Sequence, residues 1–104
     1  MPTTSINGQQ VEVNEEGFLL DPSVWTEELG TELARLIGIT MTDAHWAPIR
    51  FLREDHAVMG ETPTLRRVTT QTGIPVKELF ALFPGKPAKK MAYVAGLPKP
   101  KGCV

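Results

Sequence analysis

The chain has 104 residues, 41% of them hydrophobic, which is enough for one domain with a single small core. Its 11 basic and 12 acidic side chains give a net charge of -1, so bulk charge indicates neither a nucleic-acid nor a membrane partner. No long apolar run, signal-peptide pattern or second cysteine is present, and we expect a cytoplasmic protein without a disulfide, a metal or another cofactor.

The charges are unevenly distributed along the chain. Residues 1–34 contain seven acidic side chains and no basic one, because the first base is Arg35. Residues 35–104 contain all 11 bases and five acids, a balance of +6. The near-neutral average therefore conceals an acidic first third and a basic remainder.

The first residues predict a β-hairpin. Residues 3–6 and 9–13 carry β-branched side chains, and Asn7-Gly8 between them supplies the positive φ angles of a type I′ turn. A lone hairpin is only marginally stable in water, so it must lie against something. We expect that contact to begin at Phe18, Leu19 and Leu20.

Apolar spacing and capping residues then predict two longer helices. The first begins at Asp21-Pro22 or at Thr26 and ends near Ile37, with its apolar face formed by Leu29, Leu33, Leu36 and Ile37. The second begins after Thr42 as N-cap and ends at Gly60. Its inner face is formed by Trp46, Ile49 and Leu52, with His56 as a further candidate. Pro48 fits this helix only if the helix begins late.

Three shorter helices follow. One begins at Thr62-Pro63, and the next, begun by Ile74-Pro75 and ended by Pro84, is separated from it by a turn at Gly73. The apolar positions of this pair are Leu65, Val68, Val76, Leu79, Phe80, Leu82 and Phe83. The last helix runs from Pro87 to about Ala95 and ends at Gly96. The pattern predicts a mostly α (α+β) domain over residues 1–96, with an N-terminal hairpin and a helix-turn-helix-like pair.

Residues 97–104 read LPKPKGCV and predict a mobile, exposed C-terminal arm. Two prolines keep such a backbone extended, and the segment could reach about 26 Å from the body. The arm carries the only thiol, Cys103, which as a thiolate could accept a sulfur atom as a persulfide and carry it to another protein. Lys99 and Lys101 would modestly favour the anion. The alternative is a frayed terminus whose cysteine is incidental, and in either case removal of residues 97–104 should change stability little.

The segment LFPGKPAKKMAYVAGLPKPKGCV, residues 82–104, resembles the C-terminal region of the DsrC/TusE family of sulfur-trafficking proteins. His45-Trp46, Phe51-Leu52-Arg53, Pro63 with Leu65-Arg66, and the EEGF element also resemble motifs of this family, so the resemblance covers nearly the whole chain. It implies a compact helical domain with a mobile arm whose Cys103 binds sulfur. It also implies sulfur donors of the Tus/DsrEFH or rhodanese type, and an acceptor such as a tRNA-thiolating enzyme, sulfite reductase or a heterodisulfide-reductase-like protein.

Three departures from the family pattern narrow this expectation. Ala92 stands where dissimilatory members have a second cysteine, so the disulfide or trisulfide of that chemistry cannot form within this chain. The stretch between Val68 and Leu79 lacks the charged insertion of the dissimilatory members. In Gly85-Lys86-Pro87, the first two residues stand in the reverse of the order that is usual in the family. The resemblance therefore implies a single-cysteine carrier or regulator, either TusE-like or DsrC-like.

Other basic residues suggest alternatives. Residues 63–83 have helix-turn-helix spacing, and Arg66, Arg67 and Lys77 could meet DNA phosphates, although an ordinary helix pair explains the same pattern. A cluster of Lys86, Lys89 and Lys90 could hold an acidic partner or tRNA phosphates, or be a solvated helix face.

We take Cys103 as the catalytic residue. Arg66, Lys89, Lys99 and Lys101 are candidates for docking or thiolate stabilisation, and Arg66 could equally form a surface salt bridge. The sequence shows no catalytic triad, carboxylate pair or phosphate-binding glycine loop. Any transferase activity would be a half-reaction shared with a partner protein.

Overall fold

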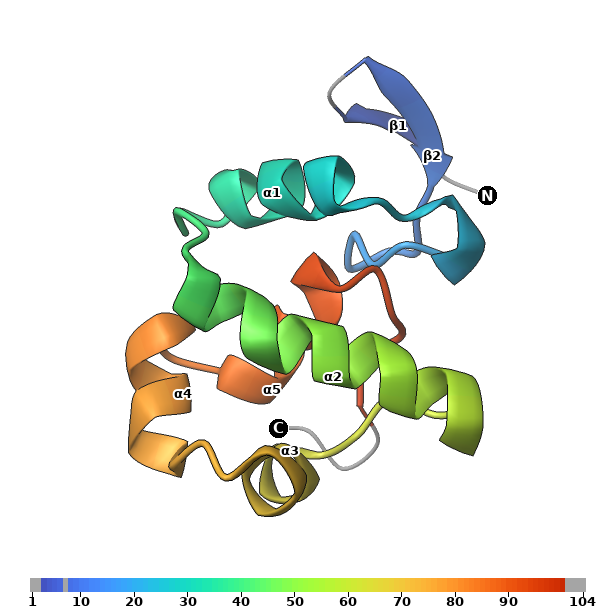
Figure 1. Cartoon of the computed structure of the whole chain (residues 1–104). Coiled ribbons are helices and arrows are strands. Elements are labelled where there is room, and N and C mark those ends of the chain that lie inside the picture. Colours follow the sequence, from blue (N-terminus) through green and yellow to red (C-terminus); the bar gives the residue numbers. More distant parts are fainter. Residues whose placement is uncertain (1–2, 7, 101–104) are drawn as a thin grey trace.

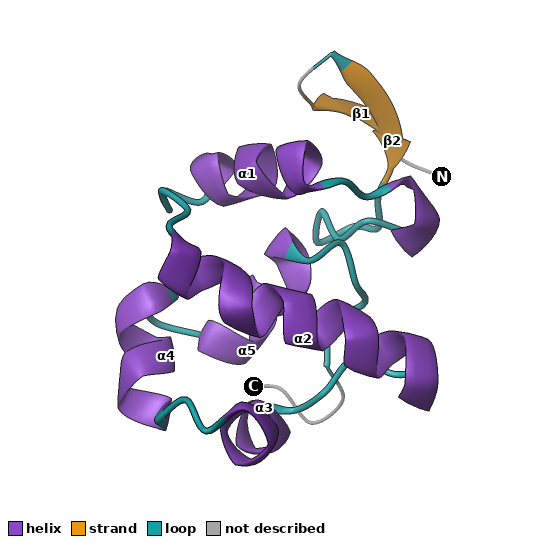
Figure 2. Ribbon diagram, in the orientation of Figure 1, coloured by secondary structure: helices purple, strands orange, loops and turns teal. Residues whose placement is uncertain are grey.

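The computed structural model describes residues 3–6 and 8–100, which form a hairpin followed by helices (Figures 1 and 2). The strands are β1 (Thr3–Ile6) and β2 (Gln9–Glu12), and a short 3-10 helix, η1, spans Pro22–Val24. The α-helices in this part of the chain are α1 (Glu27–Leu36), α2 (Asp43–Met59), α3 (Leu65–Thr72), α4 (Val76–Leu82) and α5 (Pro87–Val94). The predicted fold class, mostly α with an N-terminal hairpin, is confirmed.

The hairpin lies against α1, as its need for support requires. β1 and β2 are antiparallel, with Ile6 opposite Gln9, and Gly8 has a φ of 79°. Asn7 lies outside the described residues, so the turn type stays a prediction. The inner side chains of the hairpin form a small apolar cluster with α1, composed of Ile6, Val11, Val13, Leu19, Leu29 and Leu33. Phe18 and Leu19 are buried as predicted, whereas Leu20 is exposed.

Both predicted starts of the first helix are used. Asp21 caps η1 by accepting a hydrogen bond from the Ser23 backbone N–H, and Thr26 caps α1 by accepting one from that of Leu29. The prediction that Leu36 belongs to the core is wrong, since it is 52% exposed. The buried face of α1 consists of Leu29, Gly30, Leu33 and Ala34. At 3.6 residues per turn, Leu36 lies roughly 90° from the centre of that face.

Helix α2 begins after Thr42 and ends at Gly60, as predicted. His45 strengthens its start, because the Thr42 backbone N–H donates to Nδ1 at 3.1 Å and Nε2 donates to the Leu82 carbonyl at 3.0 Å. The expectation that Pro48 requires a late start is wrong, because the helix runs through it. Proline leaves the carbonyl four residues earlier without a helical partner, and that residue, Ala44, is exposed and can be hydrated.

Helix α3 begins later than predicted. Its N-cap is Thr64, which accepts a hydrogen bond from the Arg67 backbone N–H, and not Thr62. The Thr62 hydroxyl is unavailable for capping because it donates to the Pro98 carbonyl at 2.7 Å. The helix-turn-helix-like pair is present, with Gly73 at a φ of 78° between α3 and α4. Of the apolar positions that the sequence places on α4, Leu79 is buried, whereas Val76 and Phe80 are exposed and do not belong to the core.

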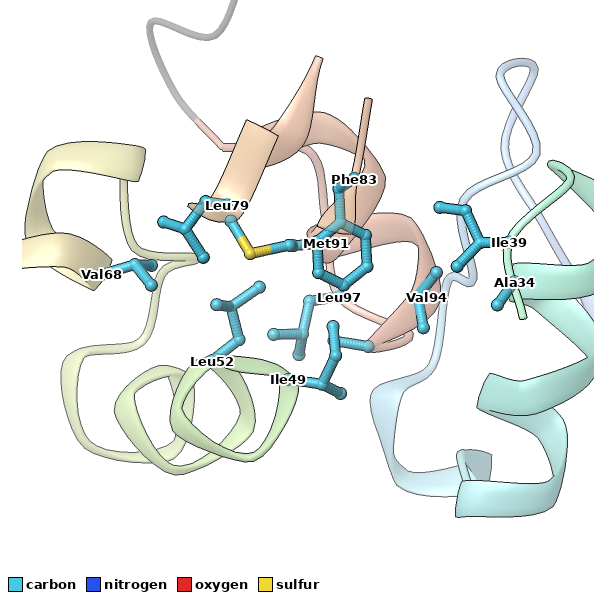
Figure 3. Close-up of a cluster of buried hydrophobic side chains, with 11 residues drawn as sticks. Ala34, Ile39, Ile49, Leu52, Val68, Leu79, Phe83, Met91, Val94 and Leu97 are labelled. Carbon is cyan, nitrogen blue, oxygen red and sulfur yellow. The ribbon is translucent and has the colours of Figure 1, made fainter. Parts of the chain in front are cut away.

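Helix α5 lies at the centre of the molecule. It contacts α1, α2 and α4, which surround it in Figure 1. The main core combines side chains from all of these helices and is drawn in Figure 3; it consists of Ala34, Ile39, Ile49, Leu52, Val68, Leu79, Phe83, Met91, Val94, Ala95 and Leu97. None of the described helices is long and apolar enough to span a bilayer.

Candidate functional site

The predicted arm begins inside the core. Leu97 is 1% exposed and lies beside Ile49 and Phe83 in Figure 3, and Pro100 is also buried. Between these two residues, Pro98 and Lys99 are exposed. The expectation of a free, exposed arm from residue 97 is therefore wrong at Leu97 and Pro100, and we call residues 97–100 the arm root. Residues 101–104, with Lys101 and Cys103, lie outside the described residues.

The chain reversal at Gly96 explains why the arm root is packed. Gly96 has a φ of 69°; its N–H donates to the Tyr93 carbonyl at 3.2 Å, and the Leu97 N–H donates to the Ala92 carbonyl at 3.0 Å. This pair of bonds is a Schellman motif, which typically places an apolar residue just after the glycine against the helix it ends. Leu97 is that residue. The sequence signal, glycine followed by leucine at a helix end, was present and was assigned only to helix termination.

An Arg53–Trp25 clamp holds the end of α5. The Trp25 indole N–H donates to the Val94 carbonyl at 2.8 Å, and the Arg53 guanidinium lies 4.4 Å from the centroid of the Trp25 ring. Arg53 donates to the carbonyls of Ala95 at 2.8 Å and Pro22 at 2.9 Å. Its burial lowers the pKa of the guanidinium, which nevertheless stays charged at neutral pH. These contacts fix the direction in which the chain leaves α5, and sequence reasoning missed them.

Two of the predicted lysines meet at one carboxylate. The Nζ atoms of Lys89 and Lys99 lie 3.7 Å and 3.5 Å from Oε1 of Glu16. Glu16 is held in a tight turn because the Asn14 side-chain oxygen accepts hydrogen bonds from the backbone N–H groups of Glu16 and Phe18, at 2.9 Å and 3.0 Å. Glu16, which belongs to the EEGF element, is thus a site residue that no pattern in the sequence singled out. The acidic first third of the chain here contacts the basic remainder.

The predicted Arg66 is not part of this arrangement. It is exposed on α3, and no ion pair joins it to a described side chain. Its neighbour Arg67 instead forms a two-pronged ion pair with the buried Asp55, with Nη2–Oδ1 and Nε–Oδ2 distances of 2.7 Å and 2.9 Å. This pair joins α2 to α3 close to Thr62, which holds the arm root. Arg67 is engaged in this ion pair. Of the three bases considered for contact with DNA phosphates, only Arg66 and Lys77 on helices α3 and α4 therefore remain available.

The Asp55–Arg67 pair predicts a pH dependence of stability. Hydrogen bonding to Arg67 lowers the pKa of Asp55 in the folded protein below the unfolded value of about 3.9. Its stabilising contribution is therefore complete above that unfolded value and is lost as pH falls through the lower, folded value. Asp55→Asn should reduce the free energy of unfolding at about pH 7 and have little effect at about pH 2, measured by urea denaturation. The exposed neighbour Glu54, changed to Gln, is the control, and an Asp55→Asn deficit that persists at low pH would contradict the assignment.

The described residues contain no group of three or more His, Cys, Asp or Glu side chains placed to hold a metal ion. The arm root is surrounded by ion pairs and hydrogen bonds around Glu16 and Arg53. These features can position a chain segment and attract an anion.

Comparison with known proteins places this architecture in a family. A family model described as DsrC-like protein matches residues 5–104. The chain belongs to the DsrC-like family. The sulfurtransferase TusE of Photorhabdus laumondii is 36% identical over 104 residues, covering 93% of this chain and 94% of that protein.

Solved structures of the family superpose closely on this DsrC-like chain. The NMR structure of Allochromatium vinosum DsrC has a TM-score of 0.86 and 36% identity, covering 98% of this chain and 97% of that one. The oxidized gamma-subunit of the dissimilatory sulfite reductase (DsrC) from Archaeoglobus fulgidus has a TM-score of 0.84 and 33% identity, covering 99% and 100%. The resemblance drawn from the sequence is confirmed.

Two of the quoted motifs of this DsrC-like chain meet in space. Arg53, from the Phe51-Leu52-Arg53 motif, donates to the carbonyl of Ala95, which lies within the C-terminal segment of residues 82–104. Ala92, at the position of the second cysteine of dissimilatory members, is fully buried in α5. Arg53 thus joins two segments of the chain that resemble the family at the arm root.

Proposed function

We propose that this DsrC-like chain is a sulfur-relay protein that carries sulfane sulfur as a persulfide on Cys103. The observation that carries the proposal is the anchored arm root, which is followed three residues later by the only thiol of the chain. A relative over nearly the full length is named a sulfurtransferase, which supports the same role.

The chemistry requires one accessible thiolate and a partner persulfide. The Cys103 thiolate attacks the outer sulfur of a donor persulfide; a new S–S bond forms, the donor S–S bond breaks, and the donor leaves as a thiolate. Delivery to the acceptor reverses these roles. With one cysteine in the chain, no intramolecular disulfide can compete with this exchange.

The anchored root shortens the reach of the thiol. Cys103 stands three positions after Pro100, so the thiol-bearing residue can lie at most about 11 Å from the root. This is less than half of the reach expected for an arm that is free from residue 97. Donor and acceptor must therefore dock close to the body, where Lys89 and Lys99 support contact with an acidic surface.

Partner classes follow from the family. We propose a donor of the sulfurtransferase class, Tus/DsrEFH-like or rhodanese-like, and an acceptor enzyme of either tRNA thiolation or sulfur metabolism. The names of the relatives support both, since one is a sulfurtransferase and another is a subunit of a sulfite reductase. Lys101 and Arg66 remain proposed contributors to docking or to stabilisation of the thiolate.

The test is intact mass spectrometry after incubation with polysulfide or with a persulfidated sulfurtransferase. We expect the mass to rise by about 32 Da per sulfur, to return to its initial value with reductant, and to stay unchanged for Cys103→Ser. Loading of the Cys103→Ser variant, or the absence of loading from every donor, would contradict the proposal.

A further inference from the structure

A groove beside α5 is not used by the sulfur chemistry. It has a volume of about 460 Å³, and its apolar lining includes Phe18, Ile37 and Tyr93. The rings of Phe18 and Tyr93 pack edge to face, with centroids 5.8 Å apart, so this lining is firmly supported. We call this feature the α5 groove.

The rim of the α5 groove is positively charged. Lys86, Lys89 and Lys90 line it together with Glu16. Lys89 and Lys90 stand three and four positions after Lys86, the N-cap of α5, so all three lie at the start of this helix, and like charges at these spacings repel. The first turn of α5 contains no acidic side chain to offset them. The lysines therefore place positive charge at the N-terminal end of α5, where the helix dipole makes positive charge unfavourable.

Much of this charge is unpaired. Glu16 is shared between Lys89 and Lys99, while neither Lys86 nor Lys90 forms an ion pair with a described side chain. Glu16 is itself 45% exposed, and its contacts of 3.5 Å and 3.7 Å are long for ion pairs. A carboxylate brought by another molecule could therefore replace Glu16 at modest cost.

We propose that the α5 groove binds an acidic segment of a partner protein, which places an apolar side chain against Ile37 and Tyr93 and its carboxylates at the rim lysines. The carboxylates of the bound segment compete with Glu16 for Lys89 and Lys99. Because Lys99 belongs to the arm root, occupation of the groove is communicated directly to the segment that precedes Cys103. This inference rests on the proposed function and adds the surface on which a relay partner docks.

The apolar lining favours a protein segment over nucleic acid. A phosphate backbone would use the lysines but would leave Ile37 and Tyr93 without a matching apolar group, whereas a peptide supplies both kinds of contact. The edge-to-face contact of Phe18 with Tyr93 also leaves Phe18, which is 2% exposed, unavailable as a stacking platform for bases.

The experiment is a titration of the full-length, isotope-labelled chain with the peptide acetyl-Asp-Glu-Phe-Glu-Asp-amide, followed by amide NMR shifts at low salt. We expect saturable shifts at residues 16–18, 85–93 and 99, and an affinity about tenfold lower for the matched amide peptide acetyl-Asn-Gln-Phe-Gln-Asn-amide. Lys86→Glu with Lys90→Glu should weaken binding about tenfold, and Glu16→Gln should strengthen it about threefold.

The variants are chosen to stay folded. Acidic residues near the start of a helix are favourable, so the double charge reversal should not destabilise α5. Lys77→Glu, on the exposed surface of α4 and outside the groove, is the matched control and should bind like the parent chain. Absence of saturable shifts, shifts confined to other surfaces, or unchanged binding by the double variant would overturn the inference. Tighter binding of octauridylate RNA at the same residues would replace the protein partner with nucleic acid.

Sulfur loading from polysulfide, measured by intact mass, tests the proposed function independently of the α5 groove. The double variant should gain the same mass as the parent chain, because small donors need no docking surface. A chain that loads sulfur but does not bind the peptide in the groove overturns only the docking surface. A chain that binds the peptide but loads no sulfur overturns only the relay function.

Discussion

Gly96→Ala is expected to lower the free energy of unfolding by about 3 kcal/mol. Gly96 has a φ of 69°, where a side chain costs roughly 1–2 kcal/mol. An added Cβ would also collide with Cδ1 of Trp25 and lie 3.1 Å from Cδ2 of Leu19. Because Trp25 is held by its bond to Val94 and by Arg53, the indole cannot move aside without loss of those contacts. Urea denaturation measures the effect.

Gly38→Ala separates the cost of the positive φ angle from the cost of the collision with Trp25. Gly38 has a φ of 79°, but a Cβ there would meet no atom within 4 Å. Its substitution should therefore carry only the backbone cost, about 1 kcal/mol. Equal losses for the two variants would show that Trp25 does not fix the end of α5.

Leu97→Ala is expected to lower the free energy of unfolding by about 3 kcal/mol, because it leaves a cavity in the main core. Its matched control is Leu36→Ala, a leucine that is 52% exposed at the end of α1, for which we expect a loss below about 0.5 kcal/mol. Thermal and urea unfolding of the two variants give the comparison. A Leu97→Ala loss no larger than that of Leu36→Ala would restore a free arm from residue 97.

These two leucines also show what the sequence could predict and what it could not. Apolar spacing located α1 and α2, and proline and glycine positions located α3, α4 and α5, although α3 begins later than predicted. The caps at Thr26, Thr42 and Gly60 were found because capping depends on neighbouring residues only. Leu36 is exposed because α1 is rotated so that Gly30 and Ala34 face the core. Periodicity alone does not decide which of two adjacent faces of a helix is buried. Leu97 was missed because prolines on either side of a lysine suggest an extended solvated segment, while the preceding glycine returns the chain to the core.

The site was predictable to a similar extent. The family motifs pointed to the C-terminal end of the chain, and two of the lysines proposed there and on the last helix meet at Glu16. Three features of the site were not predicted: the carboxylate that pairs with those lysines, the Arg53–Trp25 clamp, and the ion pair that Arg67 forms with Asp55. Each is a contact between segments that are distant in the sequence. Such contacts depend on tertiary packing, which no local pattern of residues specifies.

The central position of α5 bears on how the chain folds. The bond between Trp25 and Val94 joins residues 69 positions apart, and α1 and α2 both pack on a helix that follows them by dozens of residues. During synthesis, the apolar faces of α1 and α2 emerge before the helix that covers them, so contacts of high sequence separation must form last and slowly. The arm root acquires its anchors only in that final step. A chain that has not completed its fold therefore cannot present its thiol from a fixed position, which links competence for transfer to the completion of folding.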